Sequence, residues 1–268
     1  MATASQAIAA GSYQTRVVIR EHDELGDLAA SLNAMASALE EAEQRRVHLI
    51  GDVAHEIRTP LATVRGYLEG LADGVVEPSP ELFAQLHDET GRIQRLVDDL
   101  QELSRVESGR ITLHTRPIAP MRLIDAAASR LASAFDEKNV RLSVERRGAL
   151  PDVLADEDRT IQVLTNLLSN ALRYTPGEGE VRLGAAREDQ FIRFSVRDTG
   201  TGIPAEHLPR VFDRFYRVDP ARSRAMGGSG IGLTIARSLV ESQGGTISAE
   251  SAGSDQGSLF GFTLPIAH

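Results

Sequence analysis

The strongest periodic pattern in the chain runs from Val47 to Leu71, where apolar residues recur at alternating spacings of four and three. This spacing predicts a helix that buries one narrow seam against partner helices. His55, Glu56 and Thr59 fall outside the seam, and His55 and Thr59 are one turn apart on a shared face. Because Pro60 lacks the amide that would bond the carbonyl of Glu56, we expect the helix to bend beside His55.

A heptad register from Leu25 to Leu49 precedes this helix and is out of phase by one residue with the register that starts at Ile50. Two packing phases that meet just before His55 predict a joint. Rotation of the upstream helices could strain or relax the helix at such a joint. An ordinary coiled-coil spacer would show the same heptads.

A second helix is predicted after the turn-forming stretch that follows Leu71. Ser79 is its expected cap, Pro80 its first residue and Gly109 its end. Two antiparallel helices with one apolar stripe each cannot enclose a core alone. We therefore expect a helical hairpin that forms a homodimer as a four-helix bundle.

From Ile118 the heptads give way to a mixture of helical and strand-like periods, which predicts an α/β sandwich with strands paired partly as hairpins. The predicted helices are 121–135, 158–174 and 230–243, and the predicted strands are 140–145, 180–186, 191–197, 246–250 and 259–264.

Composition narrows the function classes. At 268 residues the chain has room for two compact units of roughly 150 residues each. Cysteine is absent, which excludes disulfides and thiol chemistry and fits a reducing cytoplasm, and a net charge of -9 argues against a nucleic-acid partner. No apolar run approaches the roughly 20 residues of a membrane span, so we expect the chain as given to be soluble. Lys138 is the sole lysine, and it follows no Walker-type glycine loop.

Four stretches of the second unit carry polar or glycine-rich features that a packed core does not need. In T-N-L-L-S-N-A-L-R-Y, Asn166, Asn170 and Arg173 share one helix face, although an ordinary solvated face would look alike. In D-T-G-T-G-I-P, Gly200 and Gly202 permit tight turns beside the acceptor Asp198, as in many common loops.

The third and fourth stretches follow the second one along the chain. F-D-R-F-Y-R contains Phe212, Phe215 and Tyr216, which at one-turn spacing could also be core residues. G-G-S-G-I-G-L leads into a helix, so free amides at the helix N-terminus can face phosphate oxygens. A short glycine pattern alone also arises by chance. The candidate nucleotide-binding residues of this fourth stretch are Gly228, Gly230, Ile231, Gly232 and Leu233.

Two resemblances bring these features together. The run H-E-I-R-T-P-L resembles the phosphoacceptor box of bacterial sensor histidine kinases of two-component systems. This resemblance makes His55 the phosphorylated residue, Glu56 its general base and Thr59 a residue that helps position water when the partner is dephosphorylated. The four stretches, in this order, resemble the N, G1, F and G2 boxes of the Bergerat-fold ATP-binding domain of the same kinases.

The second resemblance implies ATP and Mg²⁺ as cofactors. It assigns Asn170 to the metal, Asp198 to the adenine amino group, and Asn166 and Arg173 to the vicinity of the phosphates. Tyr174 would stack on the base. The glycines of the G2 box would flank the phosphates, and residues 212–229 would form a mobile lid.

The domain boundaries expected from these resemblances are a partial HAMP linker and signalling helix at 1–44, a dimerisation and phosphotransfer domain at 45–109, a flexible linker at 110–119 and the catalytic domain at 120–268. The two resemblances imply that the chain forms a homodimer and that a response-regulator receiver domain is its partner. They also imply that the chain is the cytoplasmic portion of a membrane sensor, whose transmembrane helices would lie upstream.

Three rival functions stay open at this level. An ATP-hydrolysing machine of the same superfamily carries a glutamate where this chain has Asn166, which cannot accept the proton of water. A non-enzymatic dimeric scaffold would show a degenerate nucleotide site. A serine kinase of the anti-sigma-factor type would have no use for the histidine run.

Overall fold

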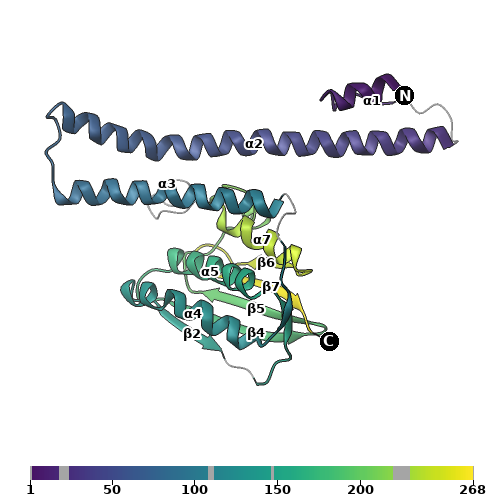
Figure 1. Cartoon of the computed structure of the whole chain (residues 1–268). Helices are drawn as coiled ribbons and strands as arrows, with labels where there is room; N and C mark the ends of the chain where they lie inside the picture. Colours follow the sequence, from purple (N-terminus) through teal and green to yellow (C-terminus); the bar gives the residue numbers. More distant parts are fainter. Residues whose placement is uncertain (1, 18–23, 108–111, 146–147, 220–229, 268) are drawn as a thin grey trace. The chain divides into compact units, whose positions relative to one another are not determined.

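The computed structural model describes residues 2–17, 24–107, 112–145, 148–219 and 230–267 (Figure 1). The chain divides into two compact units, Met1–Asp73 and Gly74–His268. The first unit is helical, and the second joins one long helix to an α/β domain. Among the described residues, no helix is both long and apolar enough to span a membrane.

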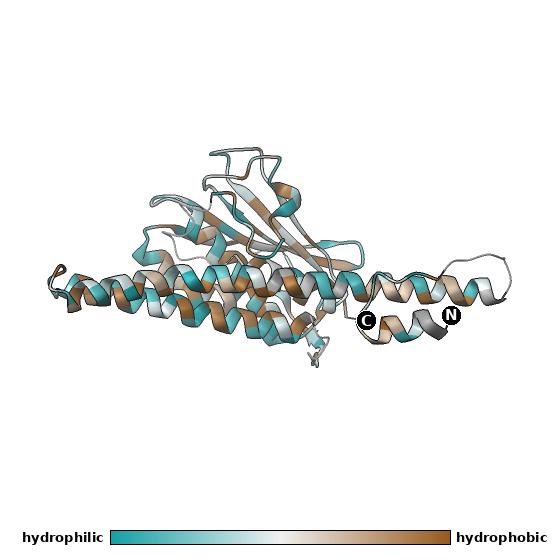
Figure 2. Ribbon diagram, turned by 90° about the horizontal axis from the view of Figure 1, so that it is seen from above, coloured by the Kyte–Doolittle hydropathy of each residue, from teal (hydrophilic) through white to brown (hydrophobic). Residues whose placement is uncertain are grey.

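The first unit consists of α1 (Ala2–Ala9) and α2 (Glu24–Ala72). The predicted helix around His55 is confirmed, and α2 runs for 49 residues without a break at Pro60 or at the junction of the two registers. Brown apolar residues recur along α2 in the hydropathy view (Figure 2). The bend that we expect beside His55 stays a prediction.

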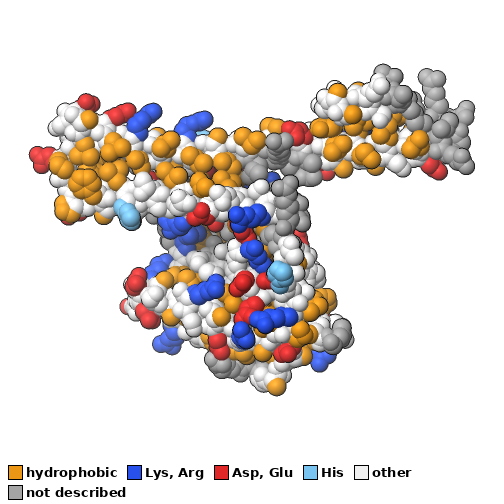
Figure 3. All heavy atoms as spheres, viewed as in Figure 1, with side chains coloured by type: hydrophobic (Ala, Val, Ile, Leu, Met, Phe, Trp, Pro, Cys, Tyr) orange, Lys and Arg blue, Asp and Glu red, His pale blue; other side chains and the backbone are white. Residues whose placement is uncertain are grey.

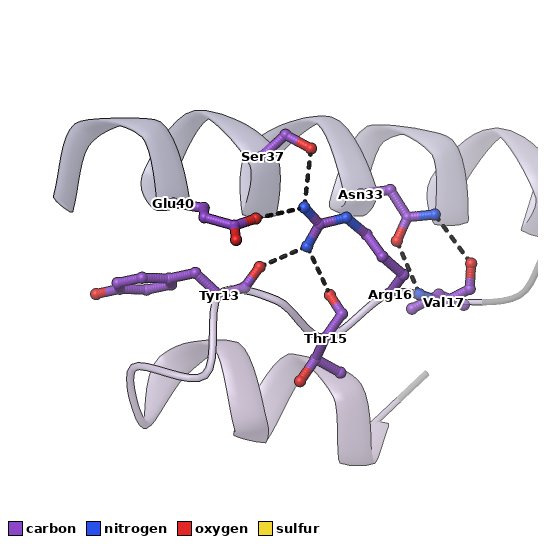
Figure 4. A network of polar contacts seen from close by, with 7 residues as sticks. All are labelled: Tyr13, Thr15, Arg16, Val17, Asn33, Ser37 and Glu40. Atoms are coloured by element: carbon purple, nitrogen blue, oxygen red, sulfur yellow. Dashed lines mark hydrogen bonds and ion pairs between the residues drawn. The ribbon is translucent and has the colours of Figure 1, made fainter. Parts of the chain in front are cut away.

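A polar network ties the segment after α1 to α2 (Figure 4). The Arg16 guanidinium donates to Glu40 Oε2 at 2.8 Å and to Ser37 Oγ at 3.2 Å. Asn33 uses both ends of its amide: Oδ1 accepts from the Val17 amide at 2.8 Å, and Nδ2 donates to the Val17 carbonyl at 2.9 Å. These contacts fix the end of the described connector beside α2.

The second unit begins with α3 (Pro80–Glu107). The predicted cap is confirmed, because Ser79 Oγ accepts a hydrogen bond from the Leu82 amide at 3.2 Å. The expected end at Gly109 lies outside the described residues. Glu102 of α3 forms an ion pair of 2.6 Å with Arg159, so α3 contacts the α/β domain of its own unit.

The α/β domain is built on a five-stranded sheet in the order β2-β4-β5-β7-β6. β2 and β4 are parallel, and the other neighbours are antiparallel, which confirms the expectation of partial hairpin pairing. The strands are β2 (Arg141–Glu145), β4 (Glu180–Glu188), β5 (Phe191–Asp198), β6 (Ile247–Glu250) and β7 (Ser258–Pro265).

Among the described residues, three helices cover one face of this sheet: α4 (Pro120–Glu137), α5 (Glu157–Tyr174) and α7 (Gly232–Ser242) (Figure 1). The core lies between these helices and the sheet. Phe194 and Phe262 are opposite each other on β5 and β7, and their rings stack with centroids 4.9 Å apart. The core therefore fixes α5 and α7, which carry two of the predicted motifs.

The linker expected at 110–119 differs in part from the structure. Arg116–Ile118 forms β1, which pairs antiparallel with β3 (Val153–Ala155). Asp156 Oδ2 also accepts a hydrogen bond from the His114 amide at 2.8 Å. The end of the predicted linker is thus part of the α/β domain, because its backbone groups find partners there.

Candidate functional site

The α/β domain contains a cavity of about 320 Å³ to which each of the four predicted stretches contributes. Its walls come from α5, the loop after β5, the segment before the undescribed residues 220–229, the start of α7 and the start of β7, with Asp99 of α3 and Ser254 of the loop between β6 and β7. Of the predicted cofactor-binding residues, Asn166, Asn170, Arg173, Tyr174, Asp198, Gly202, Tyr216, Gly230, Gly232 and Leu233 line it. The structure thus brings together residues that are far apart in the sequence.

Helix α5 presents its polar stripe to the cavity because its apolar residues face the sheet. Leu164, Leu167 and Leu168 are fully buried, while Asn166 and Asn170 are part-exposed. Asn166 Nδ2 donates to the Gly232 carbonyl at 3.1 Å and joins α5 to the start of α7. A carboxylate at this position could not donate that bond.

Asp198 lies at the end of β5, buried to 5% exposure. Its Oδ1 accepts hydrogen bonds from the Gly200 amide at 2.8 Å and the Ser258 amide at 3.2 Å, and its Oδ2 accepts one from the Ser258 hydroxyl. These donors hold the carboxylate at one edge of the cavity. Ser258 was not among the predicted site residues, since only the sheet register brings it opposite Asp198.

The loop after Asp198 is tied to the end of α5. The Thr201 amide donates to the Tyr174 carbonyl at 3.2 Å. Gly202 has φ of +65°, and a Cβ atom there would lie 2.0 Å from the Gly253 carbonyl oxygen. The chain can therefore make this turn only with glycine.

The aromatic stretch divides into core and cavity residues. Tyr216 lines the cavity, and its hydroxyl is 2.6 Å from His207 Nδ1, while Arg210 lies 4.3 Å from its ring centroid. Phe212 does not line the cavity but packs edge-on against Phe260. Neither His207 nor Arg210 carries a motif signal, because their role depends on the fold of the turn.

Phe215 also does not line the cavity. Its backbone takes φ of +57°, and its amide donates to the Gly230 carbonyl at 2.9 Å. This bond joins Phe215 to Gly230, which lie on either side of the undescribed residues 220–229. A Cβ atom on Gly230 would come within 2.9 Å of Phe215 Cα, so only glycine permits the contact.

The other predicted residues of the glycine stretches have different positions. Ile231 is fully buried at the N-cap of α7 rather than in the cavity wall. Gly200 does not line the cavity either; its amide holds Asp198. Gly228 lies outside the described residues, as does the greater part of the predicted lid.

Two cations lie at the C-terminal end of α5. Burial lowers the pKa of Arg173, and the neighbouring charges of Arg95 and Arg217 lower it further, while Tyr174 and Asp99 oppose the shift. Burial also lowers the pKa of Lys138, with the charge of Arg173 adding to the effect. Anionic groups beside Arg173 would relieve this repulsion.

The chemistry of these side chains fits a purine nucleotide with its metal. Asp198 offers carboxylate oxygens to an amino group, and Arg173 offers donors to phosphate oxygens. Asn170 offers an amide oxygen, which is a hard ligand suited to Mg²⁺ together with phosphate oxygens. Among the described residues, no group of three or more His, Cys, Asp or Glu side chains could hold a metal ion.

The predicted phosphoacceptor residues belong to the first unit. His55 is exposed on α2, Glu56 and Thr59 are part-exposed, and Thr59 Oγ1 is 3.4 Å from the His55 carbonyl. The imidazole is thus available to a reaction partner, and the three residues lie within about one helical turn.

The sequence matches three family models, each over a different part of the chain. Residues 155–268 match "Histidine kinase-, DNA gyrase B-, and HSP90-like ATPase", residues 45–109 match "His Kinase A (phospho-acceptor) domain", and residues 1–41 match "HAMP domain".

Similar curated proteins include the signal transduction histidine-protein kinase BaeS of Escherichia coli, which is 39% identical over 90% of this chain and 52% of its own length. The sensor histidine kinase WalK of Bacillus subtilis is 38% identical over 93% of this chain and 41% of its own length. The chain therefore spans about half the length of these relatives.

Solved structures of similar fold include the Acinetobacter baumannii histidine kinase AdeS, with a TM-score of 0.66 and 25% identity over 80% of this chain and 98% of that one. Full-length ShkA in complex with AMPPNP has a TM-score of 0.61 and 29% identity, covering 82% of this chain and 46% of that one. The histidine kinase ThkA in complex with the response regulator protein TrrA has a TM-score of 0.69 and 25% identity, covering 85% of this chain and 66% of that one.

Proposed function

The chain belongs to the sensor histidine kinases of bacterial two-component systems, and we propose that it phosphorylates its own His55 from ATP and passes the phosphoryl group to an aspartate of a response regulator. One observation carries the proposal. The cavity that gathers Asn166, Asn170, Arg173 and Asp198 occurs in a chain that also exposes His55 on a separate helical unit.

In this proposal Asp198 binds the adenine amino group, and Tyr174 stacks on the base. Arg173 and the backbone amides at Gly230 and Gly232 bind phosphate oxygens. Asn170 would hold Mg²⁺, which when bound neutralises phosphate charge and orients the phosphates for transfer. The complex of the related ShkA with AMPPNP supports ATP as the nucleotide.

In this proposal the imidazole of His55 is the nucleophile. Its neutral ring nitrogen attacks the γ-phosphorus, a P–N bond forms, the bond to the β-phosphate oxygen breaks, and ADP leaves. Glu56 accepts the proton released from the ring. Asn166 supports this assignment over ATP hydrolysis, since its amide donates to the Gly232 carbonyl and offers no base to activate water.

The second transfer requires a partner. We propose that a response-regulator receiver domain docks on the helical hairpin of a homodimer, and that the chain is the cytoplasmic portion of a membrane sensor. The complex of the related ThkA with TrrA supports the choice of partner, and the HAMP match supports the membrane context. In the reverse direction, Thr59 would help position the water that dephosphorylates the partner.

The direct test is incorporation of label from ATP carrying a labelled γ-phosphate, with Mg²⁺, into wild type and His55→Gln. His87→Gln is the matched control, because His87 is exposed on α3 and lies outside the phosphoacceptor run. We expect label in wild type and His87→Gln, and a loss of at least about a hundredfold in His55→Gln. The label should be released by acid and retained in base.

Four results would contradict the proposal. Label that persists in His55→Gln would place the phosphoryl group elsewhere, and label that is stable in acid would indicate a hydroxyl acceptor. Steady release of inorganic phosphate without a phosphoprotein intermediate would favour the ATP-hydrolysing rival. Absence of nucleotide binding in wild type would favour the scaffold.

A further inference from the structure

Lys138, the only lysine of the chain, joins the C-terminal ends of two helices. It is the C-cap residue of α4, and its side chain reaches the last turn of α5. Its ammonium donates to the Leu172 carbonyl at 2.6 Å and to the Arg173 carbonyl at 2.9 Å. A cation in this position satisfies unpaired carbonyls and compensates the negative end of the helix dipole.

These two bonds complete the cap of α5. A helix leaves its last four carbonyls without intrahelical partners. Thr175 donates to the Ala171 carbonyl, Lys138 donates to those of Leu172 and Arg173, and Thr201 donates to that of Tyr174. Lys138 therefore supplies the partners of half of these groups, from a single side chain.

The capped turn carries residues that line the cavity. Arg173 and Tyr174 lie within it, and Asn170 is one turn earlier. The cap also borders the loop after β5, since the Thr201 amide bonds the next carbonyl in the series. Loss of the ammonium would leave two partly buried carbonyls unpaired, which favours fraying of this turn.

We propose that Lys138 is a positioning residue for nucleotide binding, which acts by holding the last turn of α5 so that Arg173 and Tyr174 face the cavity. The inference rests on the proposed function of that cavity. Lys138 does not line the cavity itself, so its effect must pass through the backbone of α5.

The experiment measures the Kd of an ATP analogue by calorimetry, and the KM for ATP in autophosphorylation, on the whole chain. Lys138→Met removes the donors and keeps the length of the side chain, whereas Lys138→Arg keeps a cation that can donate. Arg130→Met is the charge control, because Arg130 is exposed on the same helix. Ile124→Val is the stability control, since Ile124 is fully buried in α4.

We expect Lys138→Met to raise the Kd and the KM for ATP about tenfold, with the rate at saturating ATP within about threefold of wild type. Lys138→Arg should recover most of the affinity. Arg130→Met and Ile124→Val should bind as wild type does, even where Ile124→Val lowers the melting temperature.

A Lys138→Met variant that melts earlier but binds with wild-type Kd would overturn the inference and leave the proposed function intact. Absence of binding in wild type would instead overturn the proposed function. If Lys138→Met does not fold, Lys138→Gln and Lys138→Arg decide the matter. An equal Kd in wild type and Lys138→Gln would then contradict the role of the charged cap.

Discussion

Asp198 shows how a residue predicted for ligand binding is itself held in place. The pattern D-T-G-T-G identifies the acidic residue and its turn, and Asp198 lines the cavity in the structure. The partners that orient its carboxylate are less visible. Gly200 is adjacent, but Ser258 comes from a strand that is distant in sequence, so no local pattern could reveal the contact.

The same limit applies to the aromatic stretch. Phe212, Phe215 and Tyr216 look equivalent by spacing, yet Tyr216 alone of the three lines the cavity. The difference arises because Phe215 takes a positive φ and Phe212 packs against Phe260. Spacing in the sequence therefore does not distinguish the aromatic residue that lines the cavity from the two that do not.

At the residue scale, replacement of Gly202 by alanine should impair both folding and binding. The new Cβ would lie 2.0 Å from the Gly253 carbonyl oxygen, and the backbone at Gly202 has a φ of +65°, which residues other than glycine rarely adopt. We expect a loss of about 1–3 kcal/mol in the free energy of unfolding and a weaker Kd for an ATP analogue. Gly177→Ala is the control, because its Cβ would be 3.4 Å from the nearest atom. Equal urea midpoints for the two variants would refute the steric argument.

At the scale of elements, long periodic segments were predictable and short ones were not. The expected helix at 158–174 corresponds to α5 (Glu157–Tyr174), and the expected strand at 191–197 to β5 (Phe191–Asp198). β1 and β3 are three residues each, which is too short to display an alternating pattern. Their pairing depends on contacts between distant segments, so sequence reasoning assigned β1 to a linker.

The start of α5 yields a prediction at this scale. Asp156 caps the helix, since its Oδ1 accepts from the Arg159 amide at 3.1 Å, and its Oδ2 holds the His114 amide. We expect Asp156→Ala to lower the free energy of unfolding by about 1–2 kcal/mol. Urea denaturation followed by circular dichroism measures this loss. Asp158→Ala is the control, because Asp158 is exposed in the first turn of α5, two residues after Asp156, and is not the cap. No loss for Asp156→Ala, or a loss equal to that for Asp158→Ala, would contradict a specific role of the cap.

At the scale of the whole molecule, the sequence indicates two kinds of unit because its hydrophobic period changes near Ile118. The structure divides the chain earlier, at Asp73 and Gly74, so α3 belongs with the α/β domain. Glu102 of α3 forms an ion pair with Arg159 of the α/β domain, and Leu96 and Leu103 of the same helix are buried. Heptad spacing predicts which face of α3 is apolar, but it does not predict which element covers that face.

The apolar seam of α2 leads to a prediction about assembly. Ile50, Leu61 and Leu68 are more than half exposed in the single chain, at 59%, 55% and 52%. Orange hydrophobic atoms extend along the helical region in the space-filling view (Figure 3). Exposed apolar side chains at heptad spacing indicate a surface that another helix covers. We expect a second copy of the chain to supply that helix.

Leu61→Glu should therefore dissociate the dimer, because a carboxylate at the seam would be buried without a partner on association. Thr63→Glu introduces the same charge at an exposed position about 200° around the helix from Leu61, so it should leave the dimer intact. Light scattering after size-exclusion chromatography gives the mass of each variant. A monomeric wild type, or a Leu61→Glu variant with the mass of a dimer, would remove the seam as the site of association. Dissociation by Thr63→Glu as well would show that added charge, rather than the seam, controls assembly.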